Sequence, residues 1–393
     1  MRRFAAAALA LFSLIAAPAG AATLKVGFVT TLTGGEGAMG RDMLEGFELG
    51  LRHFGGRFGV IEVELQAVDD RRQPEEAARA AGRLAAEGAV LILGNTSEEN
   101  LTAALAPVGG MPGALVLGLG EPPAAMAGTG CRPSFFSLAP TVGTYEEAIG
   151  RLVAARGHKR VWVVGSGDEQ GRRTIDAFRR GYPQSLAGET LNRRGQMNFG
   201  PEVMAIRQAR PDAVFTALEG GIAVAFVRQW AATAPDDEDI PLFGTVRTFG
   251  RPLLTAIGPA ALGAQHAAAW SDEMDHPANR RFTAEFELEY GRGASMWALR
   301  GYEAALMLEA AVKIAGGIGD RQKLRQALRG VELASPRGSL RFRHDQMVAE
   351  TIYLRQVVLT PNGRVGHEIR TALEVRATPP GPCAIIDPPP EKK

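Results

Sequence analysis

The chain has 393 residues, of which 46% are hydrophobic and 22% charged, and 44 lysine and arginine residues against 43 aspartate and glutamate residues leave a formal charge of +1. This length and composition fit a soluble globular protein of two domain-sized units and exclude a disordered or fibrous chain. Because the charge is balanced, no basic surface of the kind that nucleic-acid-binding proteins carry is expected, and nucleic acid is not an expected partner.

The first residues have the layout of a secretory signal peptide. Two arginines precede an apolar run from Phe4 to Ala17, and small residues follow Pro18. We expect a signal peptide at 1–21, cleaved after Ala21, with Ala22 as the alternative. A membrane-spanning helix needs about 20 apolar residues, and this run is shorter. Since no cysteine lies near the cleavage site to carry a lipid anchor, the mature protein is expected to be soluble and not membrane-embedded.

Cys131 and Cys383 are the two cysteines of a chain bound for an oxidising compartment. They either form a disulfide, which would attach the C-terminal segment to the body of the protein, or remain two free thiols. The sequence leaves both alternatives open because a disulfide requires a particular geometry. A metal site is not expected, since it needs more ligands than two distant cysteines.

Short β-rich apolar runs alternate with helical patterns from Leu24 almost to Trp270, which predicts an α/β fold of βαβ units with parallel sheets. The predicted strands are Lys25–Thr30, Glu62–Val68, Ala89–Leu93, Leu115–Leu119, Arg160–Gly165, Ala213–Leu218, Pro241–Thr245 and Gln265–Ala269. The predicted helices are Pro74–Glu87, Glu98–Ala106, Tyr145–Arg156, Gln170–Arg180, Pro201–Ala209 and Gly221–Ala232. Pro107 is expected to end the second of these helices.

The alternation stops after Trp270. The remaining predicted elements are the helices Pro277–Tyr290, Ser295–Ala315 and Arg321–Arg329, and a final pair of strands near Ser339–Phe342 and Thr351–Leu359. The proline-rich tail at 377–393 lacks the apolar content to fold alone. Two similar βα halves, before and after about Pro140, indicate two lobes rather than one large sheet.

Several segments, in order along the chain, resemble the type I periplasmic solute-binding proteins of branched-chain amino-acid (Leu/Ile/Val) ABC transporters. The segment KVGFVTTLTGG at 25–35 and the helix through Gly46 and Leu49 resemble that family's first strand, LTG loop and first helix. Further similar segments are VDD at 68–70, GAVLILG at 88–94, PDAVF at 211–215 and SPRGSLRF at 335–342. Their order and spacing cover nearly the whole mature chain.

The resemblance implies two Rossmann-like lobes with parallel sheets, joined by a three-strand hinge and closing over a ligand in the cleft. It places lobe I at 22–140 and 271–347 and lobe II at 141–270 and 348–376. It also implies a monomer in the periplasm that has no cofactor and is not an enzyme. Such a protein captures a small molecule and delivers it to the membrane permease of an ABC importer.

The loop Gly94-Asn95-Thr96-Ser97 lies between a predicted strand and a predicted helix. Two hydroxyls and the unpaired N–H groups of the helix start would favour an anion there. By the resemblance, Thr96 and Ser97 match positions that bind a ligand carboxylate. Alternatively, Ser97 is only a helix N-cap and Thr96 a turn residue.

Leu119 follows the next strand, where the family commonly has hydroxyl-bearing residues that complete the carboxylate site. Here the loop offers backbone N–H groups, a leucine and then Glu121, which puts an α-amino-acid ligand in doubt. The expected ligand is therefore a small carboxylate-bearing molecule: amino-acid-like, an amide, or an organic or aromatic acid.

In lobe II, the segment GDEQG at 167–171 resembles the family's DDxYG segment, with Gln170 in place of the tyrosine. Glu219 could neutralise a ligand ammonium, and Arg247 could bind a carboxylate through two hydrogen bonds. For Gln170 and Glu219, an ordinary exposed polar residue is the alternative interpretation. Glu36 in the first loop is a further ligand-binding candidate, whereas Trp270 and Trp297 are more typical of packing.

The sequence gives little support for an enzyme. Gly35-Glu36-Gly37 with Gly40 formally matches a dinucleotide-binding pattern, but export separates the protein from cytosolic dinucleotides. No G-x-S-x-G or HExxH motif occurs, and the six histidines are scattered. A periplasmic sensor subunit for a membrane receptor is the alternative function, and it would close over its ligand in the same way.

Overall fold

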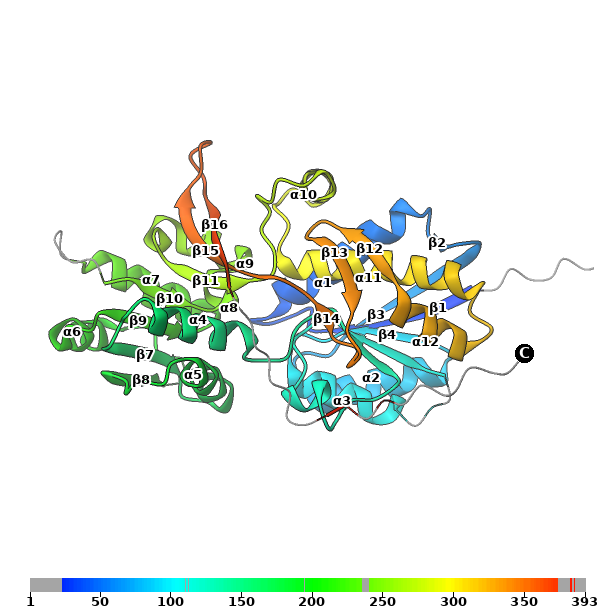
Figure 1. Cartoon of the computed structure of the whole chain (residues 1–393), viewed down its shortest axis with the longest axis horizontal. Coiled ribbons are helices and arrows are strands. Elements are labelled where there is room, and N and C mark those ends of the chain that lie inside the picture. Colours follow the sequence, from blue (N-terminus) through cyan, green and yellow to red (C-terminus); the bar gives the residue numbers. More distant parts are fainter. Residues whose placement is uncertain are drawn as a thin grey trace, which may run out of the picture.

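The computed structural model describes residues 23–109, 111, 113–193, 195–234, 240–373, 382, 383 and 385. The expected signal peptide at 1–21 and most of the proline-rich tail at 377–393 lie outside the described residues. Two large sheets lie one beyond the other along the long axis of the molecule, and each is accompanied by helices (Figure 1). The fold is mixed α/β, as the alternating pattern predicts.

The first large sheet has the strand order β2-β3-β1-β4-β5-β6 and is parallel except for the antiparallel pair β2–β3. Its central strands are buried along their whole length, which explains their continuous apolar runs. The strands are β1 (Thr23–Thr30), β2 (Arg57–Phe58), β3 (Ile61–Asp69), β4 (Leu91–Gly94), β5 (Leu115–Gly118) and β6 (Phe135–Ser137). Its helices are α1 (Gly37–His53), α2 (Pro74–Ala86), α3 (Glu98–Val108) and the 3-10 helix η1 (Ala124–Ala127).

The second large sheet has the order β16-β15-β11-β10-β9-β7-β8. Its strands are β7 (Val161–Ser166), β8 (Gly188–Asn192), β9 (Ala213–Ala217), β10 (Leu242–Gly244), β11 (Gln265–Ala268), β15 (Ile352–Leu359) and β16 (Val365–Leu373). Strands β7 to β11 pair in parallel, whereas β15 is antiparallel to both β11 and β16. The helices are α4 (Thr144–Ala155), α5 (Glu169–Gly181), α6 (Gly200–Ala209), α7 (Gly220–Ala232), α8 (Val246–Phe249), α9 (Arg251–Ile257) and η2 (Gly258–Ala261).

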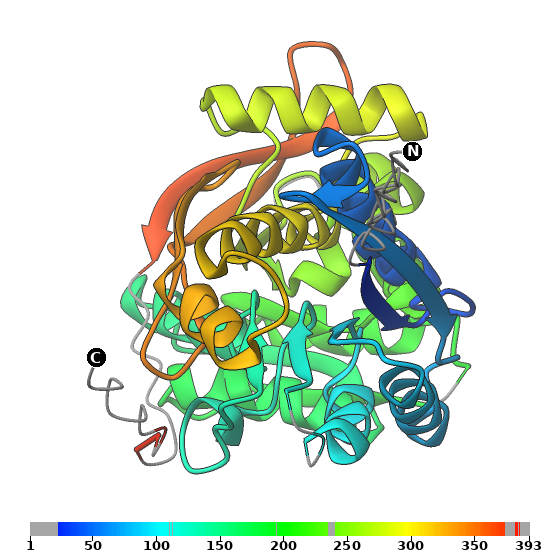
Figure 2. The same ribbon diagram turned by 90° about the vertical axis from the view of Figure 1, so that its right-hand side faces the viewer.

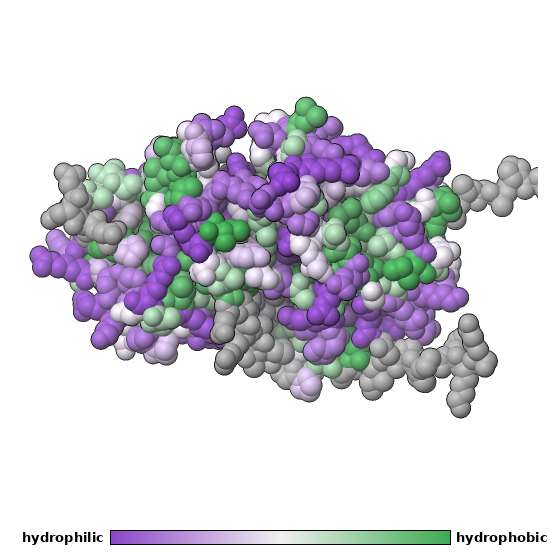
Figure 3. Space-filling model, turned by 45° about the horizontal axis from the view of Figure 1, so that its top comes forward, coloured by the Kyte–Doolittle hydropathy of each residue, from purple (hydrophilic) through white to green (hydrophobic). Residues whose placement is uncertain are grey.

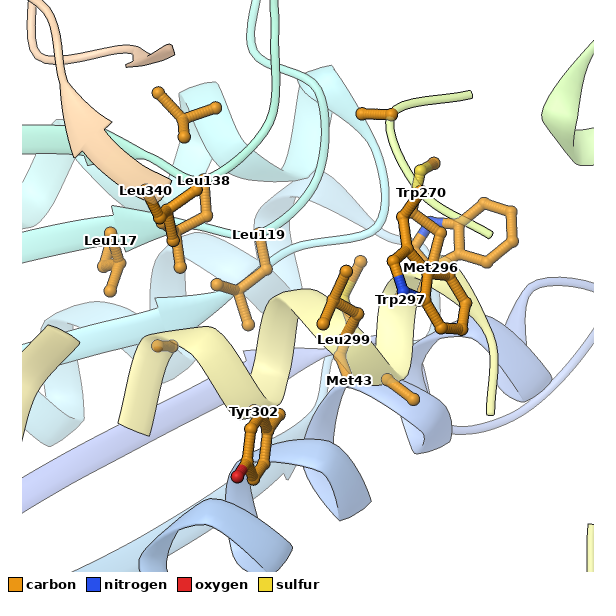
Figure 4. Packing of buried hydrophobic residues seen from close by; sticks show 14 of the residues in the cluster. Met43, Leu117, Leu119, Leu138, Trp270, Met296, Trp297, Leu299, Tyr302 and Leu340 are labelled. Carbon is orange, nitrogen blue, oxygen red and sulfur yellow. The ribbon is translucent and has the colours of Figure 1, made fainter. Parts of the chain in front are cut away.

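Helix α11 (Met296–Ala315) packs so closely against α1 that the two helix backbones approach each other directly (Figures 2 and 4). A Cβ added at Gly46 would lie 1.9 Å from the Ala298 carbonyl oxygen, and one at Gly301 would lie 1.9 Å from that of Met43. The two glycines therefore allow the close approach of these helices. The other elements of this part are α10 (Pro277–Tyr290), α12 (Arg321–Gly330) and a small sheet of β12 (Glu332–Ser335), β13 (Gly338–Phe342) and β14 (Val348–Ala349).

The chain passes between the two large parts of the molecule after β6, after β11 and after β14 (Figure 1). The first and third of these crossings begin side by side, because Ser137 and Met347 form an isolated parallel bridge. The side chains of Cys131 and Cys383 form a disulfide, which attaches the C-terminal segment to the loop before β6. The face of the molecule in Figure 3 is mostly hydrophilic, with its apolar residues in small separate groups.

Three local expectations differ from the structure. Helix α3 does not end at Pro107 but continues to Val108. A proline in the last turn removes only one hydrogen bond, and the Gly109 N–H still donates to the Leu105 carbonyl oxygen. The two final strands do not pair with each other, since β13 lies in the small sheet and β15 in the second large sheet. The sequence prediction also omitted the partly exposed edge strands β8 and β16.

Candidate functional site

A cavity of about 670 Å³ lies between the two large parts of the molecule. The loops after β4, β5, β9 and β10 contribute to it, so it lies at the carboxyl ends of strands from both large sheets. Its described lining includes Ser97, Glu121, Glu146, Gln170, Arg173, Glu219, Thr245, Arg247 and Glu350. The first crossing, Pro140 to Thr144, also lines it.

Ser97 and Thr96 are held by different hydrogen bonds. Ser97 is the N-cap of α3, and its hydroxyl accepts a hydrogen bond from the Asn100 N–H at 3.2 Å while the residue also lines the cavity. The Thr96 hydroxyl lies 2.7 Å from that of Thr31, which itself donates to Asp70 at 2.6 Å. Thr96 is therefore the donor to Thr31, and its hydroxyl is part of a buried network beside the cavity.

Leu119 lies in the hydrophobic core and not among the cavity-lining residues (Figure 4). Its N–H donates to the Gly94 carbonyl oxygen at 3.0 Å, and its own carbonyl oxygen accepts from Arg300 at 3.2 Å. Both backbone groups are thus occupied within the protein. Two residues later, the nearly buried Glu121 faces the cavity instead.

Arg247 connects the two halves of the cavity. Its Nη2 donates to the Thr96 carbonyl oxygen at 3.0 Å, while its Nε lies 3.7 Å from the Glu219 Oε1 and its Nη1 lies 3.8 Å from the Glu36 Oε1. Burial disfavours the charged guanidinium, but the carboxylates of Glu219 and Glu36 outweigh this and raise the pKa of Arg247. Glu36 itself is buried beside the cavity and does not line it.

Gln170 and Arg173, both on α5, make further contacts across the cavity. The Gln170 amide donates to Glu219 at 3.1 Å, and its oxygen accepts from Arg72, which follows β3 in the first half of the chain. Arg173 lies 2.9 Å from Glu98 at the start of α3 and also pairs with Glu99. Side chains from α5 and α8 therefore bridge the two halves over the cavity.

A buried network that sequence reasoning missed lies next to the crossings. The guanidinium of Arg337 donates to both carboxylate oxygens of Glu303, at 2.9 and 2.7 Å, and also to Glu350. The Tyr145 hydroxyl donates to Glu350 at 3.0 Å and accepts from Arg300 at 3.0 Å. Burial and then the Glu350 carboxylate raise the pKa of Tyr145 well above its ordinary value. The signal was present as two charged residues, Arg300 and Glu303, in the mainly apolar first half of helix α11.

Trp270 and Trp297 are packing residues. Trp270 is 1% exposed, and its indole N–H donates to Asn279 at 2.7 Å, while Trp297 is 3% exposed in the same core (Figure 4). Neither lines the cavity. Within the described ranges, no set of three or more histidine, cysteine, aspartate or glutamate side chains is arranged to hold a metal ion.

Residues 23–364 match the model of the family described as periplasmic binding protein. The chain belongs to the periplasmic binding protein family. This binding protein is 24% identical to Leu/Ile/Val-binding protein homolog 6 of Brucella melitensis over 375 residues, which are 92% of this chain and 95% of that protein. The family membership expected from the KVGFVTTLTGG segment and the later motifs is confirmed.

Solved structures share its fold. The solute-binding protein of an R. palustris ABC transporter, in complex with benzoate, aligns with a TM-score of 0.81 and 22% identity over 92% of this chain and 100% of that chain. The branched-chain amino acid transporter substrate-binding protein LivJ of Streptococcus pneumoniae, in complex with isoleucine, aligns with a TM-score of 0.77 and 17% identity over 88% and 99%. The two-lobed, parallel-dominated fold is confirmed. The family match over residues 23–364 identifies the chain as a binding protein rather than an enzyme.

The family is periplasmic, in agreement with the expected location. Across the part of the chain that the structure describes, no helix is both long enough and apolar enough to cross a membrane.

Proposed function

We propose that this binding protein captures a small carboxylate-bearing solute between its two lobes and delivers it to the permease of an ABC importer. In this proposal the protein is a monomer that is exported with its signal peptide removed and without a lipid anchor. The lobes are those expected from the sequence, except that Val348 and Ala349 go with the first lobe because β14 pairs with β13. The solute is amino-acid-like, an amide, or an organic or aromatic acid; the benzoate and isoleucine complexes of structural neighbours support the aromatic-acid and amino-acid classes.

The observation that carries the proposal is the cavity shared by both halves. The Ser97 end of α3 faces it from one side and Arg247 from the other, so a carboxylate between them would meet helix N–H groups and a guanidinium. Arg247, Gln170 and Arg173 already reach across to the first half. A ligand that fills the cavity therefore favours the closed arrangement, because it adds contacts that exist only when the halves are together.

The proposal is tested by calorimetry and small-angle X-ray scattering on the purified mature chain. We expect a ligand from a panel of amino acids, short amides and aromatic acids to bind and to reduce the radius of gyration. Binding without compaction, or chemical conversion of the ligand during incubation, would contradict the proposal. Deletion of the gene that encodes this chain should abolish uptake of the same ligand by its host cell.

A further inference from the structure

One face of helix α5 contacts the first lobe at two separate points. Gln170 and Arg173 are three residues apart on this helix, so their side chains lie on the same face. The Gln170 amide oxygen accepts a hydrogen bond from Arg72, which follows β3. Arg173 pairs with Glu98 and Glu99 in the first turn of α3. The start of α5 is therefore tied both to the loop after β3 and to the start of α3.

Arg173 lies at the centre of a cluster of charged side chains. Its Nη2 lies 2.9 Å from the Glu98 Oε1 and also pairs with Glu99, while its Nη1 lies 2.7 Å from the Glu169 Oε1 on its own helix. Burial disfavours the charged guanidinium, but the carboxylates of Glu98 and Glu99 outweigh this and raise the pKa of Arg173. Because several charges form this network, it stabilises more than an isolated surface ion pair does.

The cluster lies where the cavity opens to solvent. Arg173, Glu98 and Glu99 all line the cavity, and their side chains are 35%, 16% and 42% exposed. We call this part of the cavity its mouth. The ion pairs across the mouth join α5 of the second lobe to α3 of the first, so they exist only when the lobes are together. They are made by protein atoms alone and do not depend on which ligand fills the cavity.

We propose that Arg173 is a positioning residue that latches the closed lobes: its ion pairs with Glu98 and Glu99 close the mouth behind the ligand and slow its release. The inference rests on the proposed function and describes how its closed state is held. A latch that forms after the ligand has entered stabilises the bound state without changing the first encounter, so it acts on the dissociation rate constant. Since the ion pairs are partly exposed, salt weakens the latch.

The test measures ligand association and release by stopped-flow at pH 7.5, with whichever of L-leucine, L-isoleucine and benzoate binds. We expect R173M and E98Q/E99Q each to raise the dissociation rate constant by about fivefold and to change the association rate constant by less than about threefold. The triple variant R173M/E98Q/E99Q should release the ligand no faster than either, because all these changes remove the same contact. Raising NaCl from about 20 to 500 mM should accelerate release from the wild type, and release from R173M much less.

The opposite charges of the two changes separate a latch from a direct effect on the ligand. R173M removes a positive charge from the cavity, whereas E98Q/E99Q removes two negative ones. A purely electrostatic effect on a ligand carboxylate would therefore weaken binding in the first variant and strengthen it in the second. Faster release from both variants supports the latch. Opposite effects, or wild-type release from either variant, overturn it.

Two matched controls should release the ligand as the wild type does. R179M lies on the same helix, but Arg179 pairs with Asp176 and Glu189 inside the second lobe. E75Q/E76Q removes two carboxylates from the first turn of α2, as E98Q/E99Q does from α3. Melting temperatures of all variants should stay within a few degrees of the wild type, since partly exposed ion pairs contribute little to folding.

X-ray scattering from the ligand-free chain gives a second readout. R173E places a further carboxylate beside Glu98, Glu99 and Glu169, so its lobes should repel and its radius of gyration should exceed that of the wild type. R179E should have the wild-type radius. Equal radii for R173E and the wild type overturn the latch. Failure of all three ligands to bind counts against the proposed function, while the comparison of radii still decides the latch.

Discussion

Arg247 shows how one residue can couple binding to closure. Its guanidinium comes from the loop after β10 in the second sheet, yet its hydrogen bond to Thr96 and its proximity to Glu36 connect it to the first half of the chain. Glu219, from its own half, lies on the other side of the same group. Removing the guanidinium would leave Glu219 without the cation beside it and Glu36 with Arg72 as its remaining ion-pair partner, and it would remove a contact that exists only when the halves are together.

The variant R247M is therefore expected to weaken ligand binding by about tenfold or more and to lower the free energy of unfolding by roughly 1–3 kcal/mol, since a buried charged partner is lost. Calorimetry and urea denaturation measure the two effects. As a control, R280M removes an exposed ion pair with Asp275 and should change neither quantity by more than about 1 kcal/mol. Wild-type affinity in R247M would show that the guanidinium does not couple the halves.

The sequence identifies some of the residues that line the cavity and misses others, for a physical reason. Ser97, Gln170, Glu219 and Arg247 follow predicted strand ends, and parallel strands bring their carboxyl ends to one edge of a sheet. Glu146 belongs to a helical pattern in which a glutamate on the first turn is ordinary, so its burial depends on how α4 meets the other half. Sequence spacing does not contain that information.

Among the elements, three neighbouring strands place ionisable groups on one face of the second sheet. His266 on β11 lies opposite Arg355 on β15, and His367 on β16 has its ring centroid 5.0 Å from that of His266. Both imidazoles are fully buried. Burial first, and then the Arg355 guanidinium, hold the pKa of each histidine well below its ordinary value.

These histidines should make stability depend on pH. In the unfolded chain they take up protons as the pH falls below about 6.5, whereas in the folded protein they stay neutral to lower pH. Their contribution is therefore fully present above about pH 6.5 and is lost as the pH falls, with a slope of up to about 1.4 kcal/mol per histidine per pH unit.

Urea denaturation between pH 5 and 8 checks this expectation. The variant H266Q/H367Q should show a shallower loss of stability toward low pH than the wild type, and H344Q, at an exposed histidine, should not. An equally steep loss in H266Q/H367Q would assign the pH dependence to carboxylates elsewhere.

Sequence patterns miss the elements whose formation depends on pairing with a neighbouring strand. Strand β16 alternates buried and exposed residues only weakly and pairs antiparallel with β15, so its existence follows from the chain's return to the sheet edge. Central strands such as β4 and β5 are predictable because burial on both faces requires continuous apolar runs. The end of α3 was also mispredicted from the sequence, because a proline in the last turn of a helix destabilises it only slightly.

At the scale of the whole molecule, non-covalent and covalent links act between the two halves. Arg173 reaches Glu98 and Glu99 over the cavity, and the network of Tyr145 and Glu350 joins the crossings. The disulfide adds a link of a different kind. Cys383 follows the last strand of the second sheet, whereas Cys131 precedes β6 of the first, so the bond connects segments that the crossings alone leave apart.

Removing this disulfide should destabilise the protein mainly through the unfolded chain. The bond spans a sequence separation of 252 residues, and closing so long a loop restricts the unfolded ensemble by about 5 kcal/mol in the chain-entropy account, which is an upper value. We expect urea denaturation to give a lower free energy of unfolding for the wild type in a phosphine reductant than for the oxidised wild type, by up to that amount. The variant C131S/C383S should show the same decrease. The reductant should not affect the double variant, which separates loss of the bond from other effects of reduction. Equal stability of the oxidised and reduced wild type would mean that the bond holds the C-terminal segment in place without restricting the unfolded chain.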